Sequence, residues 1–144
     1  MSTSNYKIRR DGDGPIQAGD RFTIDRTFTK EDVLLFSTLT GDKGNHHVAP
    51  DSDGRVIVHG LLTGILPTIL GGALNFLIAT MTYNFHAPVY TGEKITCSLI
   101  IDTASPAKRG LELTATIECT NEQGTAVLTG SCAGRAKSEV PSYD

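Results

Sequence analysis

The feature that most constrains this fold is a long stretch without charge, because no Asp, Glu, Lys or Arg occurs between Val56 and Gly92. Its first part, up to Met81, is apolar over the roughly 20 residues that a membrane-spanning helix requires. That part lacks basic flanks, and it contains helix breakers and polar residues: His59, Gly60, Gly64, Pro67, Gly71, Gly72 and Asn75. The stretch therefore predicts a helix buried inside a soluble domain, and no membrane span.

The composition is that of one globular domain. The 144 residues are 39% hydrophobic and 20% charged, which fits a single hydrophobic core. A net charge of −3 argues against a nucleic-acid partner, since phosphate-binding proteins normally carry a basic face. The three cysteines show no metal-ligand spacing, and an odd number cannot all pair within one chain. With no secretory signal in the first ten residues, we expect reduced thiols and a cytoplasmic protein.

The termini are polar on both sides of the apolar part of the chain. Residues 1–17 contain the turn sequence Asp11-Gly12-Asp13-Gly14-Pro15, which predicts a flexible N-terminal arm. Residues 138–144 are predicted to form a C-terminal tail, so the domain itself spans residues 18–137.

Local patterns predict two helices and five strands within that domain. A short helix should begin at a Thr29 cap and end at Gly41, with a loop over 42–55. The uncharged helix should run over 58–70, bent at Pro67. Strands are predicted at 20–28, 76–85, 94–101, 111–120 and 125–136, the last three as an antiparallel meander.

A helix that is apolar nearly all round must be covered on most sides. The fold class predicted is therefore α+β, with an antiparallel sheet wrapped around a central apolar helix. One helix on one curved sheet leaves strand edges exposed, which predicts a homodimer.

The loop Gly41-Asp42-Lys43-Gly44-Asn45-His46-His47 is where a carboxylate and imidazoles crowd together. A spacing of five residues in a loop allows Asp42 and His47 to converge, and such a pair suits acid–base chemistry. The alternative is a surface loop with solvated histidines. Three histidines with Asp42 or Asp51 could also hold a metal, but adjacent histidines rarely point the same way, so we expect no metal site.

A second candidate site is His59-Gly60 at the start of the apolar helix. Unpaired N–H groups there can bind an oxyanion or a thioester carbonyl, and Gly60 would allow a ligand to approach closely. The alternative is that His59 caps or packs the helix and Gly60 serves close contact with a strand.

Four segments together resemble the MaoC-like hydratases and dehydratases, which are similar to (R)-specific enoyl-CoA hydratases of the hot-dog fold. They are 29–42, His47-Val48, 57–62 and 83–93, within a likeness that covers roughly 18–136. The resemblance implies a hot-dog dimer that reversibly hydrates 2-enoyl thioesters to (R)-3-hydroxyacyl thioesters on CoA or an acyl-carrier protein. No cofactor is expected, since the substrate itself carries CoA or phosphopantetheine.

The resemblance also implies roles for single residues. Asp42 and His47 match the catalytic pair, and Gly60 with its neighbours matches the oxyanion hole. The residues expected to contact substrate are His59, Gly60, Leu61, Thr63, Ile65 and Phe76.

Three departures from the family pattern leave other functions open. The loop lacks the usual Pro, the segment between His47 and His59 is short, and Ile65 stands where a Ser is usual, with Thr63 as a possible substitute. One alternative is a hot-dog acyl-CoA thioesterase in which Asp42 or Asp51 activates water. The other is a non-catalytic module that binds acyl thioesters.

Overall fold

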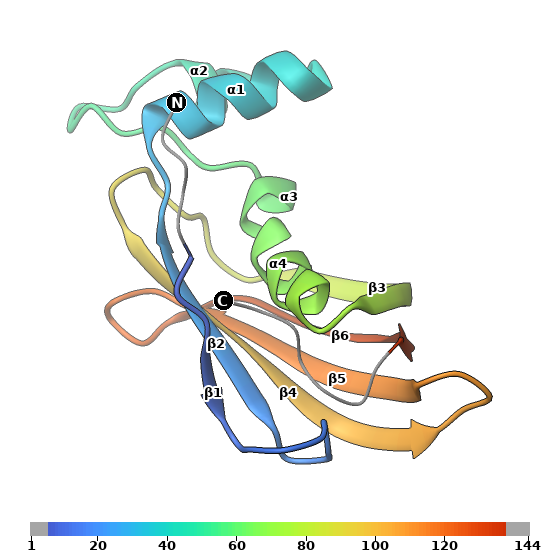
Figure 1. The fold of residues 1–144 in the computed structure, drawn as a ribbon. Helices are drawn as coiled ribbons and strands as arrows, with labels where there is room; N and C mark the ends of the chain where they lie inside the picture. The colour runs from blue at the N-terminus through green and yellow to red at the C-terminus, as the bar shows by residue number, and fades with distance from the viewer. Residues whose placement is uncertain (1–5, 138–144) are drawn as a thin grey trace.

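The computed structural model describes residues 6–137 and shows a six-stranded antiparallel sheet curved around a helix (Figure 1). The strand order is β1-β2-β4-β5-β6-β3. The strands are β1 (Arg9–Asp11), β2 (Arg21–Thr27), β3 (Phe76–Phe85), β4 (Lys94–Pro106), β5 (Leu111–Thr120) and β6 (Ala126–Ala136). The helices are α1 (Lys30–Thr40), α2 (Asn45–Val48), α3 (Gly60–Thr63) and α4 (Ile65–Ala73). The predicted α+β architecture and the meander β4-β5-β6 are confirmed.

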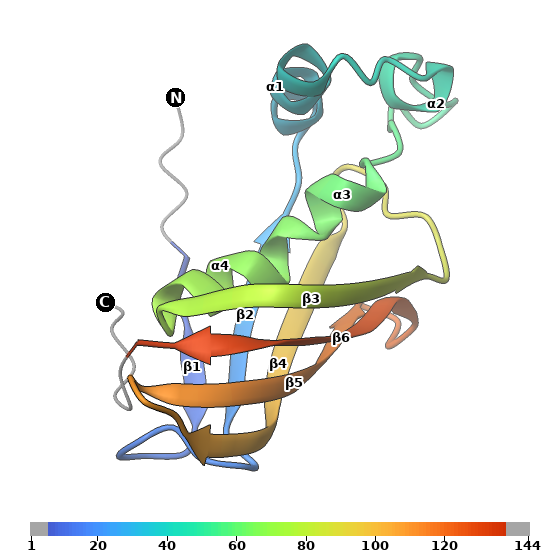
Figure 2. The same ribbon diagram turned by 90° about the vertical axis from the view of Figure 1, so that its right-hand side faces the viewer.

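Helix α4 lies in the curve of the sheet, beside β3 (Figure 2). Leu66, Leu70 and Leu74 recur at helical spacing on one side and are fully buried. The strands alternate: in β5 every second residue faces this core, and the residues between them are exposed. The cysteines Cys97, Cys119 and Cys132 are free and buried, and burial raises the pKa of the Cys132 thiol to about 11.

The predicted long helix is interrupted, and the interruption lies at Gly64 rather than at Pro67. The Tyr83 hydroxyl donates to the Gly64 carbonyl at 2.7 Å, and a Cβ at Gly64 would lie 2.6 Å from the Tyr83 ring. Burial raises the pKa of Tyr83, so its phenol stays a donor. Pro67 falls in the first turn of α4, where its missing N–H removes no helical hydrogen bond. None of the helices in residues 6–137 is long and apolar enough to cross a membrane.

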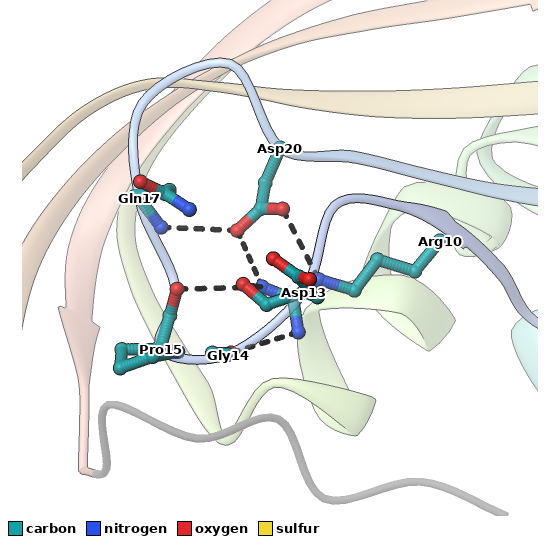
Figure 3. A network of polar contacts seen from close by, with 6 residues as sticks. All are labelled: Arg10, Asp13, Gly14, Pro15, Gln17 and Asp20. Atoms are coloured by element: carbon teal, nitrogen blue, oxygen red, sulfur yellow. Dashed lines mark hydrogen bonds and ion pairs between the residues drawn. The ribbon is translucent and has the colours of Figure 1, made fainter.

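Part of the predicted N-terminal arm is built into the sheet edge. Arg9–Asp11 form β1, antiparallel to β2. The next turn is held by Arg10, whose guanidinium donates to both Asp20 carboxylate oxygens at 2.8 and 3.1 Å and to backbone carbonyls of the turn (Figure 3). The sequence did not predict the ion pair between Arg10 and Asp20, because the two residues are ten positions apart in a polar segment. Residues 1–5 and the predicted tail 138–144 lie outside the described residues.

Helix α1 begins and ends where the sequence predicts. The Thr29 hydroxyl accepts from the Asp32 N–H at 3.1 Å, and the Asp32 carboxylate accepts from the Thr29 N–H at 2.9 Å. Gly41 ends the helix with φ of 82°, and its N–H donates to the Ser37 carbonyl. The loop prediction for 42–55 missed the single turn α2, which has four residues and no side-chain cap.

Replacing Thr29 by Ala should lower the free energy of unfolding by about 1 kcal/mol, because the hydroxyl that accepts from the Asp32 N–H is lost. Urea denaturation should show a lower midpoint with an unchanged slope. The control is Thr38→Ala, inside the same helix, where Ala has the higher helix propensity and no loss is expected. Equal midpoints for Thr29→Ala and wild type would contradict this role of the cap.

Candidate active site

His47 is a buried histidine with a fixed ring orientation. It lies on α2, its side chain is 7% exposed, and its Nδ1 is 2.6 Å from the Ile57 carbonyl oxygen. A carbonyl oxygen can only accept, so Nδ1 carries the proton and Nε2 presents its lone pair. Nε2 lies 3.9 Å from Oδ2 of Asp42, whose side chain is 57% exposed. A buried imidazole and a solvent-facing carboxylate therefore meet at the surface.

The turn after α1 orients Asp42. Its Oδ1 accepts from the Gly44 N–H at 3.2 Å, and its own N–H donates to the Thr40 hydroxyl at 3.2 Å. Hydrogen bonding of an Asp side chain to the backbone two residues on is typical of an Asx turn. This turn leaves Oδ2 facing His47, so the structure places the two side chains as the loop spacing suggested.

His59 holds the same loop from the other side. Its ring stacks on His47 with centroids 3.8 Å apart and planes 19° apart. Its Nε2 lies 3.0 Å from the Asp42 carbonyl oxygen and 3.1 Å from the Ser37 hydroxyl, so Nε2 carries the proton. His59 therefore packs between α1 and the loop, and its side chain forms no cap bond to α3.

Gly60 begins α3 next to this histidine stack. The first N–H groups of a helix have no partner within the helix, and no side chain caps them here. A Cβ at Gly60 would lie 2.9 Å from the ring of Phe85, so a glycine is what allows the close approach of β3. Free backbone donors thus lie beside the Asp42–His47 pair.

Two cavities meet at Gly60 and Phe85. The His47 cavity, about 340 Å³, is also lined by His46, Thr63 and the segment 86–89. The Asp42 cavity, about 260 Å³, is also lined by Phe36, His59 and Leu61. Each cavity thus contains one member of the pair, and a ligand at Gly60 has a passage on either side.

A metal ion does not fit the three polar side chains as they stand. Ligand atoms of Asp42, His47 and His59 lie within 4.8 Å of one another. A metal must lie in the plane of each imidazole at about 2 Å, and two stacked, nearly parallel rings share no such point. Coordination would require turning a ring off its carbonyl partner.

Asp51, the other acid considered, lies outside both cavities. Its carboxylate is bound to the Arg55 guanidinium at 3.0 Å. Backbone N–H donation by Arg55 is the largest of the interactions that keep the pKa of Asp51 below its usual range. Asp51 is thereby removed as a candidate base or metal ligand at this site.

Two expected substrate contacts, Ile65 and Phe76, line neither cavity. Phe76 is in the hydrophobic core at the far end of β3 from Phe85, and Ile65 packs against that core after the helix break. Leu61 and Thr63 do line the site, one in each cavity. Contact of Ile65 and Phe76 with substrate stays a prediction, and neither of these two cavities supports it.

Sequence reasoning missed Ser37 and Phe85. Ser37 is buried on the inner face of α1, four residues after the buried Val33. A polar residue at this helical spacing from an apolar one was the sequence signal that could have identified it. Phe85 ends a predicted strand, but its packing on Gly60 depends on tertiary structure.

No family model matches the chain. A curated 3-hydroxybutyryl-CoA dehydratase from Methylorubrum extorquens is 27% identical over 135 residues, covering 88% of this chain and 82% of that protein. The R-hydratase PhaJ1 of Pseudomonas aeruginosa has a similar structure, with a TM-score of 0.77 and 19% identity over 90% of this chain and 89% of that one. This chain has the hot-dog fold.

The resemblance drawn from the sequence motifs is confirmed by these relatives. A MaoC-like dehydratase from Rhodospirillum rubrum also shares the fold, with a TM-score of 0.64 and 15% identity over 84% of this chain and 94% of that one. The hot-dog architecture explains why α4 is enclosed by the sheet while α3 opens to the surface.

The hydrogen bonds predict opposite tautomers for the two stacked histidines. In long-range ¹H–¹⁵N spectra at about pH 8, where free imidazole is neutral, His47 should carry its proton on Nδ1 and His59 on Nε2. His86 serves as the comparison, because its Nε2 contacts a hydroxyl that can donate or accept. A proton on Nε2 of His47 would contradict the described site.

Proposed function

We propose that this protein catalyses the reversible hydration of 2-enoyl thioesters to (R)-3-hydroxyacyl thioesters. The observation that carries the proposal is the Asp42–His47 pair, 3.9 Å apart, beside the uncapped N–H groups at Gly60. The fold shared with an R-hydratase and the sequence likeness to a 3-hydroxybutyryl-CoA dehydratase support it. CoA and an acyl-carrier protein are both candidate carriers.

The backbone at Gly60 would activate the substrate. The thioester carbonyl accepts hydrogen bonds from the N–H groups of Gly60 and Leu61, which makes C3 electrophilic. When water adds to C3, negative charge develops as an enolate, and the same donors stabilise it. The thioester supplies the activation, so no cofactor or metal enters this scheme.

The Asp42–His47 pair would hold and deprotonate the attacking water. A separation of 3.9 Å is too long for a direct hydrogen bond, but a single water can lie about 2.8 Å from both atoms. The water oxygen bonds to C3, the pair takes one proton from it, and the pair returns one proton to C2. The hydroxyl group of water is thus added to C3 and a proton to C2, and the Asp42–His47 pair ends the cycle with the same number of protons as at its start. Addition from one side of the double bond is syn.

The test is hydration of crotonyl-CoA, with chiral analysis of the 3-hydroxybutyryl product. Asp42→Asn and His47→Ala should each lower kcat by about 10²- to 10⁴-fold, the usual contribution of a positioned acid–base group. Asp51→Asn is the matched control, because that carboxylate lies outside both cavities.

Other results would point to other functions. If Asp42→Asn and His47→Ala retain full hydration, the roles assigned to the pair are wrong. Release of free thiol with no loss of enoyl absorbance would indicate a thioesterase. Tight acyl-CoA binding with no turnover would indicate a binding module.

We also propose that the protein forms a homodimer through the edge of β3. The ten residues of β3 are uncharged, and Leu77 is 78% exposed on this free edge. The opposite edge, β1, is three residues long and carries Arg9, Arg10 and Asp11, which protect it from pairing. Pairing of two β3 edges would cover the apolar one.

Light scattering at micromolar concentration should give a mass near twice the 15.4 kDa of one chain. Leu77→Lys should shift the protein toward monomer, since a charge on a strand edge disfavours pairing. Leu39→Lys is the control, because Leu39 is equally exposed but lies on α1. A monodisperse wild-type monomer would count against the dimer.

A further inference from the structure

Two aromatic side chains of β3 pack against two glycines at α3. Tyr83 and Phe85 are two residues apart, so they face the same side of the strand. Gly60 and Gly64 are four residues apart, about one helical turn, and they face these rings. A Cβ at Gly64 would lie 2.6 Å from the Tyr83 ring, and one at Gly60 would lie 2.9 Å from the Phe85 ring. Phe85 also meets Tyr83 nearly edge to face, with ring centroids 6.0 Å apart. The Phe85 ring is therefore held by contacts with both the helix and its own strand.

The contact of Phe85 with Gly60 is the narrow point of the candidate site. These two residues line both the His47 cavity and the Asp42 cavity. The Cε1, Cδ1 and Cζ atoms of the ring would lie 2.9–3.3 Å from a Cβ at Gly60, so even one added carbon does not fit between them. On either side of this contact the cavities offer about 340 and 260 Å³. Space at the site is therefore scarce beside Gly60 and ample away from it.

We propose that Phe85 is a specificity-determining residue, which admits enoyl thioesters unbranched at C2 and excludes those that carry a substituent there. This inference rests on the proposed function, in which the thioester carbonyl lies at Gly60. C2 is bonded to the carbonyl carbon, so it lies at the narrow point beside the Phe85 ring. Carbon atoms from C4 onward extend into one of the cavities. A methyl group on C2 therefore meets the ring, while the same methyl group at the end of the chain enters open space.

The Phe85 ring resists displacement. Moving it off Gly60 gives up its contact with the helix and its edge-to-face contact with Tyr83. The Tyr83 ring cannot follow without losing the hydrogen bond that its hydroxyl donates to the Gly64 carbonyl at 2.7 Å. A close-packed site that must accommodate an extra methyl group shifts its side chains at a cost in free energy. A mismatch of one such group changes kcat/KM by about tenfold or more.

The experiment compares two isomeric substrates, (E)-pent-2-enoyl-CoA and (E)-2-methylbut-2-enoyl-CoA. They differ only in whether the fifth carbon is at the chain end or on C2. Hydration of each is measured in the wild type, Phe85→Leu and Phe85→Ala. Leu34→Ala is the matched control, because Leu34 is a large apolar side chain that is 64% exposed, against 53% for Phe85, and lines neither cavity. The readout is the ratio of kcat/KM for the branched substrate to kcat/KM for the linear one. Comparing this ratio between variants cancels the intrinsic reactivity of the two thioesters.

Phe85→Leu and Phe85→Ala should raise the branched-to-linear ratio about tenfold over the wild type, with the larger rise in Phe85→Ala. Leu34→Ala should leave the ratio at its wild-type value. A purely structural role for Phe85 would lower kcat/KM for both substrates together and leave the ratio unchanged, which would overturn the proposal. A wild-type enzyme that hydrates both isomers equally well would overturn it too.

A binding measurement separates this inference from the proposed function. Butyryl-CoA and isobutyryl-CoA are isomers that cannot be hydrated, and isobutyryl-CoA carries a methyl group on C2. Calorimetry should show that the wild type binds butyryl-CoA about tenfold more tightly, and that Phe85→Ala narrows this difference. If this preference is found but no enoyl thioester is hydrated, the proposed function is overturned and the role of Phe85 in binding stands. Equal wild-type affinities for the two isomers overturn the role of Phe85, and absence of binding to either overturns both.

Discussion

The site depends on two hydrogen bonds that a pair of stacked imidazoles donate to backbone carbonyls. His47, on the segment after α1, donates to the Ile57 carbonyl, and His59, on the segment before α3, donates to the Asp42 carbonyl. Each ring thus binds the backbone of the other ring's segment, and the stack at 3.8 Å joins them. Two stretches that are not paired in the sheet are fixed to each other by these side chains, together with the hydrogen bond from the Ile57 N–H to the His46 carbonyl at 2.9 Å.

This arrangement has a chemical result as well as a mechanical one. Because one nitrogen of each ring is committed to a carbonyl, the other nitrogen of His47 is left as an acceptor facing the carboxylate. The ring cannot rotate without losing its bond to Ile57 and its stacking on His59. A preorganised acceptor of this kind needs little rearrangement when a reacting group arrives.

The sequence predicted those parts of the molecule that depend on local chemistry. The Thr29 cap, the Gly41 stop and the bounds of β3 and β5 follow from capping, turns and alternation, and the structure agrees. The spacing of Asp42 and His47 likewise follows from one short turn. The position of the helix break did not follow, because it depends on Tyr83, nineteen residues away, bonding the Gly64 carbonyl.

The same distinction explains what sequence reasoning missed at the site. Ser37 and Phe85 acquire their contacts only when α1, α3 and β3 come together. Ile65 and Phe76 were expected to contact substrate, but neither lines the Asp42 cavity or the His47 cavity. Because α4 begins again after Gly64, its side chains are positioned by the sheet beneath it, and only the short turn before the break remains near the Asp42–His47 pair.

The unequal edges of the sheet set a limit on growth. A sheet with two edge strands that are both free to pair can add further copies of the chain indefinitely, as in fibres. Here one edge, β1, is short and charged, while the other, β3, is long and uncharged, so in the proposed homodimer a twofold axis would pair the β3 edges of the two copies. Such an assembly would stop at two copies, because the three charged residues of β1 at the opposite edge disfavour further strand pairing.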